Sequence, residues 1–587
     1  MSGIRTRDLD CGSLRNGMPA AFFRPARTKA ARHAAILQRV LVGLVALSSL
    51  TLLFAFRGLD DNRFVSWQWV FAPADLPALL SVAATGVLLA YWFSRAPWPA
   101  DRAAPALGVF AFLAALPFWG EPEVIVDAAR YFVQAKHLSL FGVGHFLNQW
   151  GQQIPAWTDL PLVPFLYGLL FSLAGETRLA IQAFNSLLFA GSVVLTYLVG
   201  KALWDRATGL CGAVLLLGMP YLYTQVPLML VDVPAMFFFT LTAYAAITTV
   251  ARGGVPWLFG AAVALALAML AKYSAWIALA FFPVLVLVSA RHARRKALAR
   301  AGAIVLGAAV LSGAFLLGKA GVVASQLALF WSYQVPALSR WQEGIASTFF
   351  FQIHPFITLA ALGSVALAII RKDSRYAGVG VIVLLALMLG VRRIRYLVIV
   401  MPMLALMAAY GLRAIREIPT RQFIASCAAV SALAVAVAGY LPFLRTTSAM
   451  NLKQAGEVLA AMGGDTVEVI VLPATRSRVN PAVAVPLLDL FTHQRLAYRR
   501  DLSPAVSPQP GVEATSPVRF TWEVPDAPFF LIAPEPHAPV VLVMSAADQP
   551  VPQAVANRLA GYAEARQLMV TDRVFRFQTL VRIYRPT

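Results

Sequence analysis

Charged residues are scarce in this chain of 587 residues, of which only 13% are Asp, Glu, Lys or Arg and 59% are hydrophobic. An ordinary soluble domain carries about 25% charged residues and about 45 to 50% apolar residues. The mean hydropathy of +0.69 is correspondingly high. The composition therefore excludes a typical soluble globular protein and indicates a polytopic membrane protein.

Cysteine is also rare. The three cysteines, Cys11, Cys211 and Cys427, lie far apart, and two of them fall inside apolar runs, so their spacing supports neither a disulfide framework nor a zinc site. The net charge of +21 comes from Lys and Arg residues that cluster at the ends of apolar runs. That pattern is typical of membrane topology rather than of a nucleic-acid surface, and we expect no nucleic-acid partner.

Apolar runs long enough to cross a bilayer, which takes about 17 to 25 residues, recur from Ala35 to Leu444. Basic residues crowd the first 39 positions and place the N-terminus in the cytoplasm. An odd number of spans then leaves the C-terminus outside. The sequence predicts thirteen spans, at 35–56, 76–95, 103–119, 179–200, 207–224, 230–250, 256–271, 274–290, 301–319, 353–370, 376–391, 397–414 and 422–443.

One further apolar stretch, 155–174, is broken by Pro155, Pro161 and Pro164. Counting it as a span would place the basic loop 201–206 outside. We therefore expect a re-entrant or interfacial helix in the first large outer loop.

The composition changes at Arg445, where a mixed, Pro-rich sequence begins. It contains alternating strands at 467–472 and 540–545 and a helix-like stretch at 553–568, which together predict a small α/β domain. The predicted fold is mainly α. Its parts are a cytoplasmic tail at 1–34, a transmembrane domain at 35–444 and an extracytoplasmic domain at 445–587.

Ionisable residues interrupt the apolar sequence at the predicted outer face. Asp127 and Arg130 follow the third span, Asp232 begins the sixth, and Lys272 separates two apolar helices. A buried ionisable group is costly in hydrocarbon, so it faces a cavity or a partner by default. For Lys272 alone, a side chain that extends to interface water is an equally good interpretation.

The stretch "VRRIRYLVIVMP" places Arg392, Arg393 and Arg395 at an outer loop, against the positive-inside tendency. Forked guanidinium donors match the oxygens of a phosphate attached to a lipid. The alternative is binding to anionic lipid headgroups of the outer leaflet.

Carboxylates and cations at one membrane face indicate glycosyl transfer from a lipid phosphate. Cations would stabilise the departing phosphate, and a carboxylate would take the proton of the acceptor hydroxyl. The predicted catalytic residues are Asp127 and Asp232, and the predicted phosphate-binding residues are Arg130, Tyr131, Lys272, Arg392, Arg393 and Arg395.

Several motifs resemble GT-C glycosyltransferases in their order along residues 103–420. "DAARY" at 127–131 resembles the family's first outer-loop motif, "LMLVDVPAMFF" its second aspartate, and "WTDLPLVPFLYGLLFSLAGETRLAIQAFNSL", "LALAMLAKYSAW" and "RYLVIVMPMLALMAAYGL" its remaining segments. The resemblance is to GT-C enzymes of the dolichyl-phosphate-mannose protein mannosyltransferase and lipid A aminoarabinose transferase type, which is similar to glycosyltransferase family 39.

This resemblance implies a polyprenyl-phosphate sugar as donor, hexosyl or pentosyl transfer with inversion, and Asp127 as the base. Aminoarabinose transferases have a lysine before the loop proline that corresponds to Pro161, and this chain has Leu160 there. The phosphate contacts must therefore differ. The sugar and the acceptor, a protein, lipid or glycan, stay open.

Metal chemistry is not expected. Glu121 and Glu123 could add ligands to Asp127, but the sequence has no strict Asp-x-Asp pattern. We therefore expect no cofactor and no metal dependence. His137 and His145 are interpreted as structural or solvated residues.

Two rival functions are a lipid or solute transporter, which would carry charges near the bilayer middle and an inverted repeat, and an inactive GT-C-like assembly protein. The expected location is the bacterial inner membrane, in contact with membrane lipid and with the C-terminal domain periplasmic.

Overall fold

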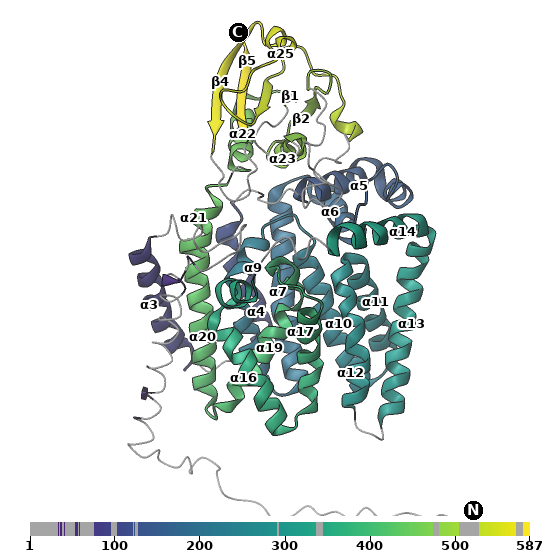
Figure 1. The fold of residues 1–587 in the computed structure, drawn as a ribbon, viewed down its shortest axis with the longest axis vertical. Helices are drawn as coiled ribbons and strands as arrows, with labels where there is room; N and C mark the ends of the chain where they lie inside the picture. The colour runs from purple at the N-terminus through teal and green to yellow at the C-terminus, as the bar shows by residue number, and fades with distance from the viewer. Residues whose placement is uncertain are drawn as a thin grey trace, which may run out of the picture.

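The computed structural model describes residues 75–95, 102–120, 123, 127–289, 293–335, 344–447, 449–472, 481–503, 527–570 and 579–587, with a few scattered residues between 33 and 58. The predicted tail at 1–34 and first span at 35–56 otherwise lie outside the described residues. Figure 1 shows a helical bundle with a smaller domain, which contains the β-sheet, above it at the C-terminal end of the chain.

The bundle consists of apolar helices. They are α3 (Leu76–Phe93), α4 (Ala103–Ala115), α7 (Arg178–Leu203), α8 (Arg206–Leu217), α9 (Pro220–Gln225), α10 (Asp232–Arg252), α11 (Val255–Ala271), α12 (Phe281–Val288), α13 (Arg294–Gly318), α16 (Pro355–Arg371), α17 (Ala377–Met388), α18 (Ile394–Leu397), α19 (Met401–Gly411), α20 (Ile418–Val435) and α21 (Leu441–Leu444). Short 3-10 and π-helical turns continue several of them.

Five helices in the described part of the chain are long and apolar enough to cross a membrane, by length and composition. They are Arg178–Leu203, Asp232–Arg252, Arg294–Gly318, Ile394–Ala414 and Ile418–Leu444. The other apolar helices of the bundle are shorter. The predicted integral membrane protein of mainly helical fold is thereby confirmed, whereas the number of thirteen spans stays a prediction.

Two helices, α5 (Asp127–Gln149) and α14 (Ala320–Leu329), lie across the end of the bundle that faces the sheet domain (Figure 1). Helix α6 (Leu162–Ala174) begins directly after Pro161 and has 13 residues, a length of about 20 Å that is too short for the hydrocarbon core. Helix α5 packs closely on α6, because a Cβ at Gly168 would lie 2.8 Å from the carbonyl oxygen of Ala135.

The C-terminal domain contains a five-stranded sheet with the order β2-β1-β3-β5-β4. Strand β1 pairs in parallel with β2 and β3, and β5 pairs antiparallel with β3 and β4. The predicted small α/β domain is present. Its elements are α22 (Ala449–Met462), β1 (Thr466–Val471), α23 (Ala484–Asp489), β2 (Arg495–Tyr498), β3 (Val540–Met544), α25 (Gln553–Arg558), β4 (Tyr562–Met569) and β5 (Leu580–Pro586).

The predicted helix at 553–568 is correct only in its first part. Helix α25 ends at Arg558, and Gly561 follows with φ 83°, a conformation that favours glycine and stops the helix. The residues after it form β4, which pairs along its length with β5. Sheet pairing therefore overrides the helical propensity of "YAEARQL".

The sheet domain is attached to α5 and to the start of α7 by charged side chains. Lys136 Nζ on α5 lies 2.6 Å from Asp489 Oδ2 at the end of α23 and 2.7 Å from Glu176 Oε2. The guanidinium group of Arg178 lies over the ring of Phe491, 5.5 Å from its centroid. These contacts hold the domain directly above α5, the helix that begins at Asp127.

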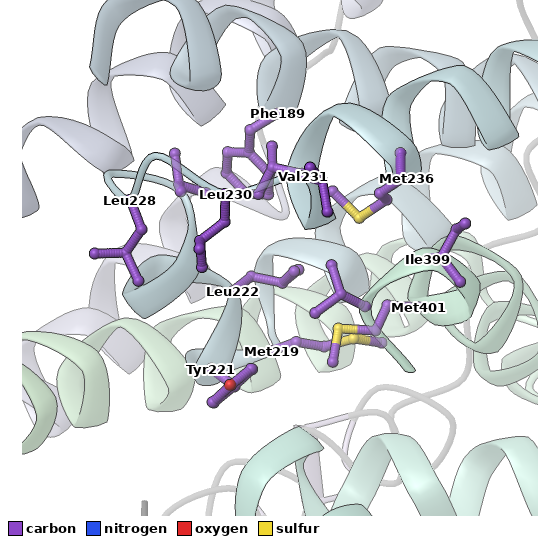
Figure 2. Packing of buried hydrophobic residues seen from close by; sticks show 14 of the residues in the cluster. Phe189, Met219, Tyr221, Leu222, Leu228, Leu230, Val231, Met236, Ile399 and Met401 are labelled. Atoms are coloured by element: carbon purple, nitrogen blue, oxygen red, sulfur yellow. The ribbon is translucent and has the colours of Figure 1, made fainter. Parts of the chain in front are cut away.

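Apolar side chains fill the centre of the bundle below this end. Figure 2 shows Leu228, Leu230 and Val231, which precede α10, packed among residues of α7, α9 and the segment around Met401. Leu228 and Leu230 are each 1% exposed. The turn that leads into Asp232 is therefore enclosed by packed side chains, and close packing of this kind resists local displacement.

Candidate active site

Asp127 is the first residue of α5, where the partial positive charge of a helix N-terminus favours a carboxylate. Its Oδ1 atom lies 3.6 Å from Arg130 Nη1, one turn further along the helix. Burial acts to raise the pKa of Asp127, but the guanidinium groups of Arg395 and Arg130 outweigh burial and lower the pKa to about 2. The carboxylate is therefore ionised at neutral pH.

Asp232 is the first residue of α10, and its side chain is 1% exposed. Lys272 Nζ lies 2.5 Å from its Oδ1 atom, and Arg395 Nε lies 2.9 Å from its Oδ2 atom. Lys272 follows the end of α11 in an extended conformation, which ends the helix and places the ammonium group beside α10. Both oxygens of Asp232 thus have a cationic partner.

Arg395 joins the two carboxylates. It lies on α18, its side chain is 7% exposed, and its Nη1 atom is 2.5 Å from Asp127 Oδ2 while its Nε atom holds Asp232. The guanidinium fork suits such bridging because its donors point in fixed directions. The structure therefore brings together the "DAARY" aspartate, the second aspartate, the lysine and one of the three arginines of "VRRIR".

A third carboxylate belongs to the same cluster. Arg130 Nε lies 2.5 Å from Asp159 Oδ2, and Gln134 donates a hydrogen bond to the same oxygen at 3.3 Å. Burial raises the pKa of Asp159 in spite of its pairing with Arg130. Asp159 is not among the site residues predicted from the sequence. The only signal for it was its place in "WTDLP", a segment of the resemblance, since a carboxylate beside prolines is otherwise an ordinary loop residue.

The remaining predicted phosphate ligands occupy different positions. Tyr131 is buried, and its hydroxyl accepts a hydrogen bond from Arg130 Nη2 at 3.4 Å. Arg393 is half-buried, and its guanidinium group lies 5.4 Å from the ring centroid of Tyr396. Arg392 is exposed, and its carbonyl oxygen accepts a hydrogen bond from Thr348. Of the three arginines, Arg395 forms ion pairs with Asp127 and Asp232, and the charge of Arg393 also lowers the pKa of Asp127.

The cluster is balanced in charge. It contains three carboxylates and three cations, each within ion-pair distance of an opposite charge: Asp127, Asp159, Asp232, Arg130, Lys272 and Arg395. A guanidinium group has five N–H donors and an ammonium group has three, so an anion that enters can bind Arg395 or Lys272 beside a carboxylate or in its place. Such an arrangement can bind a phosphate group next to an ionised carboxylate.

The described residues contain no group of three or more His, Cys, Asp or Glu side chains placed to hold a metal ion. Glu123, considered above beside Asp127 as a metal ligand, instead pairs with Arg178. His137 and His145 stack on each other with ring centroids 5.7 Å apart. His137 also packs against Phe529 of the sheet domain.

The apolar helical bundle below a small sheet domain has the fold of ArnT, a GT-C fold glycosyltransferase. Residues 158–317 match the family model described as dolichyl-phosphate-mannose-protein mannosyltransferase. The resemblance that the motifs indicated is thereby confirmed. The matched region contains Asp159, Asp232 and Lys272, whereas Asp127 and Arg395 lie on either side of it.

Two solved structures illustrate the likeness. ArnT from Cupriavidus metallidurans, bound to undecaprenyl phosphate, has a TM-score of 0.50 and 12% identity, over 81% of this chain and 97% of that chain. The archaeal oligosaccharyltransferase AglB from Archaeoglobus fulgidus, in complex with an inhibitory peptide and a dolichol-phosphate, has a TM-score of 0.44 and 12% identity, over 68% and 64%. At 12% identity the likeness to ArnT shows the fold alone. No curated protein sequence matches the chain.

Proposed function

We propose that this protein is a membrane glycosyltransferase that moves a sugar from a polyprenyl-phosphate donor to an acceptor hydroxyl at the outer face of the membrane. The observation that carries the proposal is the bridge from Arg395 to both Asp127 and Asp232, with Lys272 beside it. Phosphate-binding cations and an ionised carboxylate are the two kinds of group that glycosyl transfer from a lipid phosphate requires.

In the proposed reaction the acceptor hydroxyl oxygen attacks the anomeric carbon from the face opposite the phosphate. A new C–O bond forms as the bond to the phosphate oxygen breaks, and that oxygen leaves with the electron pair, so the anomeric centre inverts. Asp127 takes the hydroxyl proton. Arg395 and Lys272 stabilise the charge that develops on the departing phosphate, because preorganised cations act strongly in a site with little water.

The ion pairs also have a consequence for the base. A carboxylate with a pKa of about 2 is ionised but weakly basic. When phosphate oxygens compete for Arg395, Asp127 loses the partner that lowers its pKa most strongly. The pKa of Asp127 then rises, so its basicity increases when the donor is bound. Asp232, held by Lys272 and Arg395, orients both cations toward the phosphate.

The donor class is supported by the family model at 158–317 and by the fold shared with ArnT, whose crystal structure contains undecaprenyl phosphate. The proposed partners are a polyprenyl-phosphate sugar, an acceptor protein, lipid or glycan, and membrane lipid. We place the enzyme in the bacterial inner membrane with the sheet domain periplasmic. The proposed reaction uses no metal ion, in line with the expectation from the sequence.

The transporter alternative is less well supported. A translocation path would place charged side chains along the bundle, whereas the ion pairs around Arg395 gather at the end next to α5. An inactive assembly protein would have the same fold but would transfer no sugar.

An assay with purified protein tests the proposal. The protein in lipid nanodiscs is incubated with a panel of radiolabelled polyprenyl-phosphate sugars and with an extract of envelope lipids, glycans and proteins as acceptor. We expect label transfer from at least one donor, and no transfer by Asp127→Asn. The absence of transfer from every donor, with the protein folded, would contradict the proposal and favour the assembly role.

A further inference from the structure

The turn that leads into Asp232 is bound by side chains from three different parts of the chain. Glu123 Oε1 accepts a hydrogen bond from the backbone N–H of Met229 at 2.8 Å. Asn185 on α7 donates to the carbonyl oxygen of Leu228 at 2.7 Å, and Tyr167 on α6 donates to the carbonyl oxygen of Leu230 at 2.9 Å. Three successive backbone groups of the turn are therefore fixed by side chains.

Glu123 is the unusual member of this set. The residue is 0% exposed, and its Oε1 atom is paired with Arg178 Nη1, whose side chain is 10% exposed. Burying a charged pair costs desolvation energy, and well-packed apolar residues often stabilise a protein as well as such a pair does. A buried carboxylate whose acceptor oxygen binds backbone three residues before Asp232 therefore points to a role at that residue.

The geometry of Asp232 depends on this turn. Asp232 is the first residue of α10, so its Cα position is set by the path of the chain through Leu228, Met229 and Leu230. Its two carboxylate oxygens lie 2.5 Å from Lys272 Nζ and 2.9 Å from Arg395 Nε. A shift of even part of an ångström in the turn would lengthen both contacts and displace the two cations.

We infer that Glu123 is a positioning residue that fixes Asp232, and through it Lys272 and Arg395, by accepting the hydrogen bond from Met229. The inference rests on the proposed function for its effect on catalysis, and on the geometry alone for its effect on the turn. Glu123 thus lies outside the ion-pair cluster but holds the phosphate-binding cations in place. Tyr167 and Asn185 bind the same turn as hydrogen-bond donors to its carbonyl oxygens.

Three variants distinguish an effect of the position of the turn from an effect of the charge on Glu123. Glu123→Leu removes the acceptor, Glu123→Gln keeps an acceptor oxygen without the charge, and Tyr167→Phe removes a neutral donor from the same turn. Glu457→Gln on the exposed face of α22 is the matched control. We expect Glu123→Leu to lower kcat by about tenfold to a hundredfold, because small misplacements of catalytic groups have effects of this size, with a smaller change in KM for the donor. Glu123→Gln should recover most of the rate.

Hydrogen–deuterium exchange of the same proteins measures the turn without any assay of transfer. We expect faster exchange in the peptide covering 226–234 for Glu123→Leu and Tyr167→Phe, and unchanged exchange for Glu123→Gln and Glu457→Gln. If this local change occurs while the wild-type protein transfers no sugar, the positioning role stands and the proposed function fails. Unchanged exchange at 226–234, or equally faster exchange throughout the bundle, would overturn the positioning role.

Discussion

Arg395 Nη1 lies 2.5 Å from Asp127 Oδ2, although 268 residues separate the two along the chain. The contact joins the first helical turn of α5 to the short helix α18, which precedes α19. The same guanidinium group holds Asp232 through its Nε atom. One side chain thus determines the separation of the two carboxylates to which the sequence motifs assign the chemistry.

Arg395→Lys should therefore impair the enzyme although it keeps the charge. A lysine ammonium is a point charge and cannot hold Asp127 and Asp232 in the fixed directions of a guanidinium fork. Loss of one charge-assisted hydrogen bond costs ~1.5 to 3 kcal/mol, so we expect kcat/KM for the donor to fall by about tenfold to a hundredfold. Initial rates at varied donor concentration measure this.

The matched control is Arg375→Lys, because Arg375 is half-exposed and pairs with Asp373 instead of with the carboxylate cluster. It should leave kcat/KM unchanged. An unchanged dependence on donor concentration in Arg395→Lys would mean that Arg395 does not contact the donor phosphate and serves only to pair the two aspartates.

Much of this arrangement could be predicted because its charged residues stand at positions where a membrane protein seldom has them. Asp232 and Lys272 interrupt apolar runs, and the outer-loop arginines oppose the positive-inside tendency, so each gives a signal in the sequence itself. Which of the three arginines contacts the carboxylates could not be predicted. That depends on how α18 turns at the end of the bundle, where Arg392 is exposed and Arg395 is buried.

The roles of Asp159 and Glu123 could not be predicted from the sequence. Both lie in polar, Pro-containing loops, where carboxylates are common and have no special pattern. Their partners, Arg130 for Asp159 and Met229 N–H for Glu123, are distant in the sequence and meet them only after folding. Strand β4 was missed for a similar reason, since its pairing with β5 and not its own propensity determines its conformation.

Asp127→Asn and Asp232→Asn should have different effects. The first removes the proposed base and keeps its shape, and loss of a general base costs ~10²- to 10⁴-fold in rate. Donor binding should survive, because Lys272 and Arg395 remain. The second removes a charge that orients both cations, so we expect weaker donor binding together with a lower rate. Single-turnover rates and donor-binding measurements on both variants separate these effects.

Near-normal turnover by Asp127→Asn together with an inactive Asp232→Asn would assign the base to Asp232. If both variants keep normal turnover, the glycosyltransferase proposal itself must be abandoned.

The predicted topology has a direct test. The start of α13 and the end of α21 lie at opposite ends of the bundle in Figure 1. Reporter domains fused after Arg291 and after Arg445 should therefore report opposite compartments, with Arg291 cytoplasmic. If both fusions report the cytoplasm, the placement of Asp127, Asp232 and Arg395 at the outer face is wrong.

The contact between the sheet domain and α5 should depend on pH. Burial raises the pKa of Asp489 to about 6, although Lys136 opposes this effect. The groups that face Asp489 are Lys136 and, beyond it, Glu176. The ordinary value is 3.8, so the folded protein binds this proton more tightly than the unfolded chain. The stability that Asp489 contributes is therefore complete below about pH 4 and is lost as pH rises through about 6.

Asp489→Asn should remove this dependence, because the amide does not titrate and Lys136 keeps Glu176 as its partner. Between about pH 5 and pH 7.5 the linkage amounts to about 1 kcal/mol, so the free energy of unfolding of the variant, relative to wild type, should increase by about that amount. Thermal unfolding of both full-length proteins at the two pH values measures the difference. His137 lies next to Lys136, and burial lowers its pKa to about 4, so it titrates below this window. If the two proteins differ in Tm by the same amount at both pH values, Asp489 is not the group that titrates at this interface.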